Sequence, residues 1–209
     1  VFRPNFNSWH HFQLNFNHYY FSDSLINANP AYSFNQQNKV SYFGFRYFLK
    51  VDHRNEKAYP LSGYYLDVEL NQQGLFSQTG NMETGFLKAN YRQYLDLGSR
   101  LHYAAGIVGK LTTTKDQPEF LEQGLGYGRE FVRGYEYYVM DAAHFITIKQ
   151  NLKYAILPKR YMPIGFKGIK KTGFLRNLPF EKFSPFYLAV YLNLFYDYGY
   201  TSGSKDPDN

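Results

Sequence analysis

The 209-residue chain has no cysteine, a single tryptophan and no long hydrophobic run. The absence of cysteine excludes disulfides, thiolate nucleophiles and zinc sites built on cysteine. No stretch approaches the roughly 18 consecutive apolar residues of a membrane-spanning helix, and the mean hydropathy is only −0.50. The excess of positive over negative charge is also small. The 23 Lys and Arg against 17 Asp and Glu leave a net charge of +6, which does not indicate a nucleic-acid partner.

Aromatic residues, in contrast, are abundant. The chain has 22 Tyr and 20 Phe, and 21% of its residues are aromatic. Such a content, combined with a hydrophilic average, is unusual for a water-soluble protein with an apolar core. It is typical of a transmembrane β-barrel, which is apolar outside, polar inside and ringed with aromatic side chains.

Apolar and polar residues alternate with a period of two along much of the chain, which indicates β-strands. In the last such segment, for example, Leu192 and Leu194 alternate with Tyr191 and Asn193. We predict about seven antiparallel strands of roughly 9–12 residues, the length that crosses a bilayer when tilted. The alternation covers residues 12–17, 43–51, 64–71, 87–92, 100–107, 146–154 and 188–195.

The polar side of these strands favours a membrane barrel over a soluble β-sandwich. Sandwich strands are shorter, about 5–6 residues, and their apolar face is buried. Charges of both signs on the polar side suit a water-filled lumen. We therefore predict an all-β fold, a partial transmembrane antiparallel β-barrel that forms one domain over residues 1–209. The charged residues on the polar side are Arg46, Lys50, Asp67, Glu69, Lys88, Arg92, Arg100, Lys149 and Lys153.

Connections of unequal length orient the predicted strands. Residues 22–39, 72–83 and 113–142 are long and polar, whereas residues 95–99 form a tight turn. Outer-membrane barrels place long loops outside and short turns in the periplasm, and single-chain bacterial barrels have an even number of strands. The first predicted strand should therefore run outward, and further strands should lie outside this sequence. The start at Val1, without a signal peptide, agrees with an internal piece of a longer protein.

Three short motifs are more specific than the alternation. The first, Val132-Arg133-Gly134-Tyr135, lies late in the third long connection. The second, Phe195-Tyr196-Asp197-Tyr198-Gly199, ends the last predicted strand, and Asp197 falls on its polar side. The third connects the second and third strands and consists of Asp52-His53-Arg54-Asn55 followed by Tyr59-Pro60-Leu61-Ser62-Gly63.

Together these motifs resemble the BamA superfamily of outer-membrane assembly barrels (the surface-antigen type), which also includes TamA and the two-partner secretion transporters. The family has a VRGF/Y signature in its sixth extracellular loop and an aromatic-x-Asp-x-Gly motif in its thirteenth strand. The third motif is similar to a periplasmic turn of the family. The chain departs from the pattern in Tyr135, where Phe is commoner, and in His53-Arg54-Asn55, a variable part of the turn. The motif residues carried over are Val132, Arg133, Gly134, Tyr135, Asp197 and Gly199.

The resemblance implies that the chain covers about strands seven to thirteen of a sixteen-stranded barrel. It also implies insertion and folding of β-barrel proteins in the bacterial outer membrane. The partners would be outer-membrane lipids, nascent β-barrel proteins, accessory lipoproteins and the periplasmic POTRA domains of the full-length chain. Two other functions stay open. One is a protein-translocating transporter of the two-partner type, and the other is a passive diffusion porin, whose constriction loop would also carry Arg and Asp.

Arg133 and Asp197 form a predicted pair on chemical grounds. A guanidinium on a loop tip inside the lumen is partly desolvated and needs a carboxylate partner, which Asp197 offers in the planar geometry that Arg prefers. Gly134 permits a tight turn, and Tyr135 is expected to pack on the inner wall. Residues 112–142 are therefore expected to form an extracellular loop that folds inward. Alternatively, Arg133 is a solvated loop charge, or the pair only braces the barrel.

Residues 157–184 form a basic connection on the predicted periplasmic side. They carry seven Lys and Arg against Glu181 alone, interleaved with aromatic and aliphatic residues. Such a segment either rests on phospholipid headgroups, receives an accessory lipoprotein or is a solvated loop with a few anchoring aromatics.

No catalytic, cofactor or metal site is expected, and the chain is not predicted to be an enzyme. The six histidines are scattered, without the spacing of a zinc site. Asp141 lies near His144 but lacks an activated serine motif, which leaves an outer-membrane hydrolase as a minor alternative. Gly124, Gly126 and Gly128 have no βαβ context for a nucleotide loop, so they are expected to give a flexible approach to the loop tip.

Overall fold

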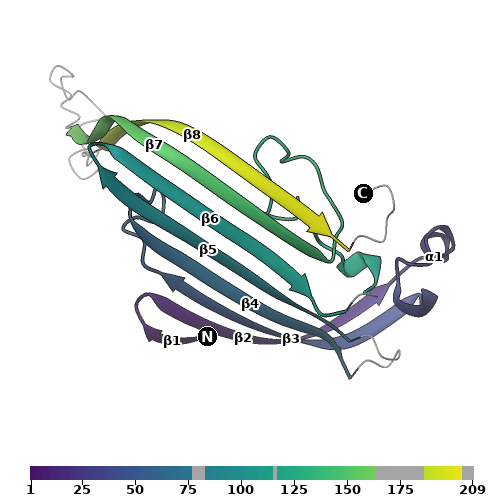
Figure 1. Ribbon diagram of the computed structural model, residues 1–209. Helices are drawn as coiled ribbons and strands as arrows, with labels where there is room; N and C mark the ends of the chain where they lie inside the picture. Colours follow the sequence, from purple (N-terminus) through teal and green to yellow (C-terminus); the bar gives the residue numbers. More distant parts are fainter. Residues whose placement is uncertain (77–82, 115–116, 163–185, 204–209) are drawn as a thin grey trace, which may run out of the picture.

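The chain forms one antiparallel sheet of eight strands in the computed structural model, which describes residues 1–76, 83–114, 117–162 and 186–203. Each strand pairs with its neighbours in sequence, so the order across the sheet is β1 to β8 (Figure 1). The prediction of an all-β antiparallel fold is confirmed. Within the described ranges, no helix is both long enough and apolar enough to cross a bilayer. The strands are β1 (Phe2–Asn5), β2 (Ser8–Tyr20), β3 (Lys39–Asp52), β4 (Gly63–Leu75), β5 (Thr84–Gly98), β6 (Leu101–Thr112), β7 (His144–Met162) and β8 (Phe186–Ser202).

Among the differences from the sequence prediction, one is an additional strand and another is the length of β7. The additional strand, β1, has four residues and no alternation to reveal it, and it pairs with β2 only through Phe2 with His10 and Asn5 with Ser8. β7 is longer than predicted because residues 157–162 pair with β8 instead of starting the basic connection. The remainder of that connection, up to residue 184, lies outside the described residues.

The tight turn is shorter than predicted. β5 and β6 are joined by Ser99 and Arg100 alone, and both have positive φ (48° and 70°), as in a type I′ hairpin turn. Residues 95–98, which were predicted to belong to the turn, lie in β5. A register shift between Asp96 and Gly98 marks a bulge there.

The connections β2–β3, β4–β5 and β6–β7 lie at the opposite end of the sheet from this turn, whereas the β3–β4 connection lies at the same end as the turn (Figure 1). The first, residues 21–38, contains a short helix that the sequence did not predict, α1 (Asp23–Ala28), and a 3-10 helix, η1 (Phe34–Gln36). The hydroxyl of Ser22 accepts a hydrogen bond from the backbone N–H of Leu25 at 3.3 Å and so caps α1. The second connection is shorter than predicted, because β4 continues to Leu75.

The register keeps the two faces of the sheet chemically distinct. Apolar residues pair with apolar residues across strands, as Leu152 does with Leu194. Polar residues pair likewise, as Lys50 does with Asp67. Side chains that are directly paired project from the same face of a sheet. The sheet therefore has one apolar and one polar face, as the alternation predicts.

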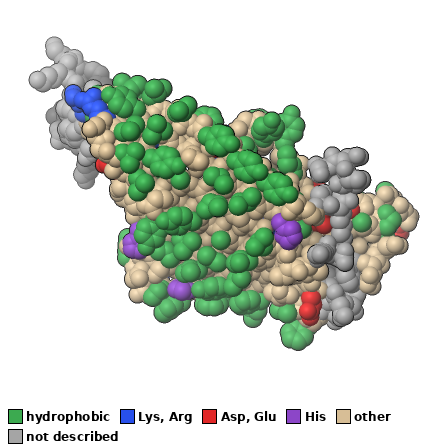
Figure 2. All heavy atoms as spheres, viewed as in Figure 1, with side chains coloured by type: hydrophobic (Ala, Val, Ile, Leu, Met, Phe, Trp, Pro, Cys, Tyr) green, Lys and Arg blue, Asp and Glu red, His purple; other side chains and the backbone are tan. Residues whose placement is uncertain are grey.

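The apolar face is exposed and the polar face is covered, which is the reverse of a soluble sandwich. Leu14, Leu192 and Leu194 are 79%, 65% and 72% exposed, and Figure 2 shows apolar side chains spread over this face of the strands. On the polar face, by contrast, Lys110 and Asp67 are buried. Large charged side chains are rarely buried unless they have partners. Lys110 donates to the carbonyl of Gln123 in a connection that folds over the polar face, and Asp67 accepts a hydrogen bond from Asn90 on the neighbouring strand β5.

The connection between β3 and β4 covers the polar face at one end of the sheet. The Tyr59 hydroxyl donates to Oδ1 of Asn193 on β8 at 3.2 Å, and Nζ of Lys153 on β7 donates to the carbonyl of Pro60 at 3.3 Å. In a flat sheet, β4 and β8 would lie about 19 Å apart, at four strand spacings. A sheet that curves toward its polar face shortens the span that this connection must cross.

The two edges of the sheet are β1 and β8, and no pairing joins them in the described residues. The sheet is therefore not closed by the part of the chain that the structure describes.

Candidate functional site

The connection between β6 and β7, residues 113–143, folds over the polar face of the sheet. Its described residues include a 3-10 helix, η2 (Glu119–Leu121). Nζ of Lys88 on β5 forms an ion pair with Oε1 of Glu130 at 2.9 Å, and Nζ of Lys110 on β6 donates to the carbonyl of Gln123 at 2.9 Å. Two charged side chains of the sheet thus hold this connection, which we call the inner loop.

Glycines bring the two limbs of the inner loop into backbone contact. A Cβ atom at Gly124 would lie 2.3 Å from the carbonyl oxygen of Met140, and one at Gly126 would lie 2.2 Å from that of Tyr138. The N–H of Met140 donates to the carbonyl of Leu125 at 2.8 Å. These glycines are needed for close packing of the limbs, whereas the sequence had suggested a flexible approach.

A second contact ties the limbs through side chains. The hydroxyl of Tyr127 donates to Oδ1 of Asp141. Burial, reinforced by this bond, raises the pKa of Tyr127 to about 12. The hydroxyl therefore stays protonated, and able to donate, at neutral pH. Asp141, considered above as half of a catalytic pair with His144, has a structural partner instead.

The VRGY motif forms the tight turn at the tip of the inner loop. The N–H of Tyr135 donates to the carbonyl of Val132 at 2.9 Å, and Gly134 has φ of +91°. A positive φ at the third position is characteristic of a type II turn and strongly favours glycine there. The turn predicted from Gly134 is confirmed, and it directs the side chain of Arg133 toward β8.

The predicted contact between Arg133 and Asp197 is present. Nε of Arg133 donates to Oδ2 of Asp197 at 2.7 Å, Nη2 donates to Oδ1, and the backbone N–H of Arg133 donates to Oδ2 at 3.1 Å. The side chain of Asp197 is only 3% exposed and that of Arg133 is 27% exposed. This is the parallel, two-pronged geometry in which a guanidinium binds a carboxylate most strongly.

The remaining donors of Arg133 are also engaged. Nη1 donates to Oδ1 of Asn151 at 2.6 Å, and Nη2 also contacts the carbonyl of Gln150 at 3.3 Å. The guanidinium lies 4.2 Å from the ring centroid of Phe195, a distance suited to a cation–π contact. Arg133 is therefore bound by two strands, β7 and β8, and is not a solvated loop charge.

Gly199 provides space for the loop tip on β8. A Cβ atom at this position would lie 2.6 Å from Cγ2 of Val132 and 3.0 Å from Cδ1 of Leu125. Val132 packs on a small buried cluster formed by Val108, Leu125 and Phe145. The absence of a side chain at Gly199 therefore lets the apolar base of the tip pack onto the strand.

The structure thus gives each alternate position of the β8 motif a separate role. Phe195 stacks on the guanidinium, Asp197 pairs with it, and Gly199 accommodates Val132. Residues at i, i+2 and i+4 of a strand share a face, so all three meet the same loop. Sequence reasoning missed Phe195 and Asn151 as members of the site. Phe195 shares a strand face with Asp197, and Asn151 shares one with Lys149. The alternation could therefore have placed both residues on the polar side.

One prediction about the motif is wrong. Tyr135 was expected to pack on the inner wall, but it is 58% exposed, and its ring lies 5.7 Å from that of Tyr138. Tyr135 instead belongs to an exposed apolar stretch that continues with Tyr137, Tyr138, Val139 and Met140.

The Asp/Arg cluster of the third motif is also a close pair. Nε and Nη2 of Arg54 donate to Oδ1 and Oδ2 of Asp52, both at 2.8 Å. Oδ1 of Asn55 accepts from the N–H groups of Leu61 and Ser62 at 3.1 and 3.2 Å. A Cβ atom at Gly63 would lie 2.1 Å from the carbonyl oxygen of His53. The motif therefore folds the connection onto itself and positions Tyr59 over the polar face.

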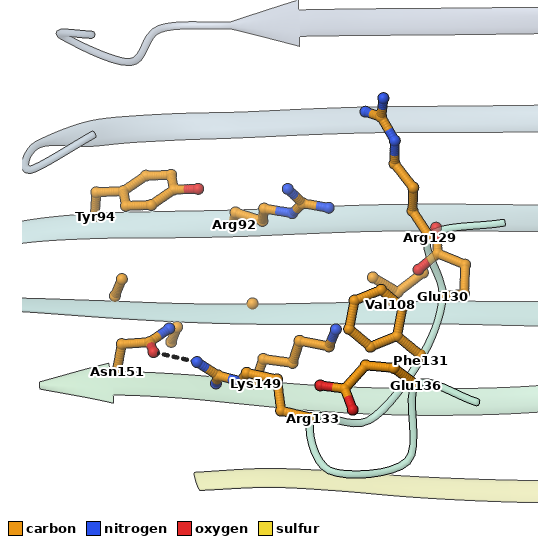
Figure 3. Close-up of a pocket in the computed structure, with 13 residues that line it drawn as sticks. Arg92, Tyr94, Val108, Arg129, Glu130, Phe131, Arg133, Glu136, Lys149 and Asn151 are labelled. Carbon is orange, nitrogen blue, oxygen red and sulfur yellow. Dashed lines mark hydrogen bonds between the residues drawn. The ribbon is translucent and has the colours of Figure 1, made fainter. Parts of the chain in front are cut away.

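Between the inner loop and strands β5, β6 and β7 lies a cavity of about 670 Å³ (Figure 3). Arg92 and Lys149 reach it from the sheet, whereas Arg129, Arg133 and Glu136 reach it from the loop. Among the described residues, no group of three or more His, Cys, Asp or Glu side chains is placed to hold a metal ion.

Comparisons of the chain with family models, with curated proteins and with solved structures found no match. The resemblance drawn from the sequence therefore rests on the three motifs alone.

Proposed function

From these contacts, we propose that the chain is part of an outer-membrane β-barrel of the BamA type, which inserts and folds other β-barrel proteins in the bacterial outer membrane. The observation that carries the proposal is the contact between the two motifs. Arg133 at the tip of the inner loop binds Asp197 of β8 through its side chain and its backbone. Two motifs that are 64 residues apart thus form one site on the polar face.

The two faces of the sheet support a position in the membrane. The exposed apolar face would contact lipid, and the polar face with its inner loop would line the lumen. A soluble protein with these strands would leave an extended apolar surface in water, which favours aggregation. The free edges at β1 and β8 would pair with further strands of the full-length barrel.

The proposed activity makes and breaks no covalent bond. In the BamA family, the first and last strands pair weakly, so that the barrel can open sideways. An incoming strand can then pair with the exposed backbone groups, while hydrophobic mismatch near the seam thins the bilayer. In this chain, Arg133 would fix the inner loop to β7 and β8 and so hold part of the wall rigid while another part opens.

Depletion of the full-length protein tests the proposal in cells. An assembly factor predicts that many outer-membrane barrels decrease together. Loss of solute uptake with normal barrel levels would instead identify a porin, and retention of one secreted protein would identify a two-partner transporter.

Reconstitution tests the same proposal directly. The full-length protein in liposomes should accelerate folding of an added β-barrel protein, and Arg133→Ala should reduce this acceleration. Arg160→Ala is the matched control, since it removes an exposed arginine of β7 away from the inner loop. If neither the wild-type protein nor the control accelerates folding, the proposal is wrong.

A further inference from the structure

The cavity beneath the inner loop has a floor of small residues on β6. Ala104, Gly106 and Val108 line it, and Arg92 on β5 and Lys149 on β7 flank it (Figure 3). The register places these two cations in line, because Arg92 pairs with Gly106 and Gly106 pairs with Lys149. A glycine therefore lies between two cations across three adjacent strands. Two strand spacings separate the cations at the backbone, about 9–10 Å.

The charges that line the cavity do not balance. Four cations and two carboxylates line it. The carboxylate of Asp197 neutralises Arg133, and Lys88 neutralises Glu130. Three cations are left, against the carboxylate of Glu136 alone.

These three cations have no ion-pair partner within 4.0 Å in the part of the chain that the structure describes; they are Arg92, Arg129 and Lys149. The closest contacts of Arg92 and Lys149 are with neutral groups, and the carboxylate of Asp197, which is paired with Lys149 across the strands, is bound by Arg133. Nε of Arg92 donates to Oδ1 of Asn90 at 3.1 Å, and Nζ of Lys149 lies 4.4 Å from the ring centroid of Phe131. The carboxylate of Glu136 accepts from the N–H of Gly134 at 3.0 Å. Three positive charges and one negative charge leave a surplus of two.

We propose that this cavity binds a phosphate monoester, with the dianionic phosphate above Gly106 and between Arg92 and Lys149. The surplus of two positive charges matches a dianion. Arginine binds phosphate oxygens with a planar, two-pronged geometry, and lysine adds a point charge. Concave walls with an excess of charge of one sign concentrate the field within the cavity. The volume of about 670 Å³ leaves room for an organic group beyond the phosphate.

This site is independent of the proposed assembly function, since it requires no β-barrel client. Its ligand could be a soluble phosphate ester or a phosphate-bearing lipid, and both have the same recognition chemistry. Titration calorimetry on the intact protein in phosphate-free detergent buffer tests the soluble form with glycerol 3-phosphate. The control ligand is glycerol, which lacks the phosphate. Nanodiscs that contain phosphatidic acid test the lipid form.

We expect saturable binding of at least one phosphate compound and no binding of glycerol. Arg92→Gln and Lys149→Gln should each raise the Kd at least tenfold. Gly106→Val should weaken binding while leaving every charge in place, because an added Cβ atom would lie only 3.3 Å from Cγ of Arg92 and the two methyl groups would occupy the space above the strand. Lys50→Gln is the matched control. It removes a lysine of the polar face that contacts Trp9 and Tyr65, outside the cavity, and should leave the Kd unchanged.

Arg92→Lys keeps a positive charge and should restore part of the affinity that Arg92→Gln loses. Absence of saturable binding by the wild-type protein to both phosphate compounds would overturn the proposal. Equal affinity of the wild-type protein and the Arg92→Gln and Lys149→Gln variants would also overturn it.

Discussion

Arg133 and Asp197 form a pair in which each partner depends on the other. Asp197 is almost fully buried, so removal of Arg133 leaves a carboxylate without its compensating charge. Breaking a buried pair in this way costs about 3–5 kcal/mol. We expect Arg133→Ala and Asp197→Ala to lower the free energy of unfolding by similar amounts, and the double variant to be little worse than either. Urea unfolding of the protein in detergent or liposomes measures all three.

A lysine at position 133 provides the control for this prediction. Arg133→Lys keeps the charge but loses the two-pronged geometry, so its stability should lie between those of the wild-type protein and Arg133→Ala. Additive losses in the Ala/Ala double variant would show that the two residues act separately.

Gly199 offers a second test, which concerns packing alone. Gly199→Ala places a methyl group against Val132 and Leu125, and such overpacking costs about 1–3 kcal/mol. The tip of the inner loop should shift from β8, and limited proteolysis should then cleave the loop faster. Gly109→Ala is the matched control on β6, because the nearest atom to its Cβ, the carbonyl oxygen of Phe145, is 3.8 Å away. Similar cleavage of both variants would refute the packing role of Gly199.

The two faces of each strand lie in different environments. Substitutions at adjacent positions of β8 can measure the difference. Leu192 is 65% exposed on the apolar face, whereas Asn193 lies on the polar face, where it accepts a hydrogen bond from Tyr59. In a bilayer, a charge on the lipid face at mid-depth costs roughly 2–4 kcal/mol. Leu192→Lys should therefore lower the free energy of unfolding in liposomes by that amount, and Asn193→Lys should lower it less. The opposite order would argue against contact of the apolar face with lipid.

The alternation alone predicts the two faces and the inward parity of Asp197, because the period of two fixes which side chains share a face. It does not predict where strands end. Asp96 and Gly98 are typical turn residues and suggested a turn, but a bulge absorbs them within β5. α1, with six residues, is too short to show a helical stripe. The role of Gly199 depends on which residue of the loop lies against it, and that contact joins parts of the chain too far apart for any local pattern to reveal.

The whole molecule has a testable orientation, since the β2–β3 and β6–β7 connections lie at one end of the sheet and the β5–β6 turn and the β3–β4 connection lie at the other (Figure 1). The chain contains no cysteine, so a single introduced cysteine reports its own position. Ser24→Cys in α1 should react with a membrane-impermeant maleimide in intact cells. Lys57→Cys, in the connection between β3 and β4, should react only after the outer membrane is permeabilised. Both positions are exposed, so the reverse pattern would invert the proposed topology.

The bond between Tyr59 and Asn193 also bears on the order of folding. It joins residues 134 positions apart, and contacts of such separation close last because most of the chain must be ordered first. The β5–β6 hairpin, with its two-residue turn, belongs to the fast local events. The Tyr59 contact would then form after the folding transition state and retain β8 in its native position. Tyr59→Ala is expected to raise the unfolding rate and leave the folding rate nearly unchanged in kinetic measurements. Slower folding would instead show that the contact forms before the transition state.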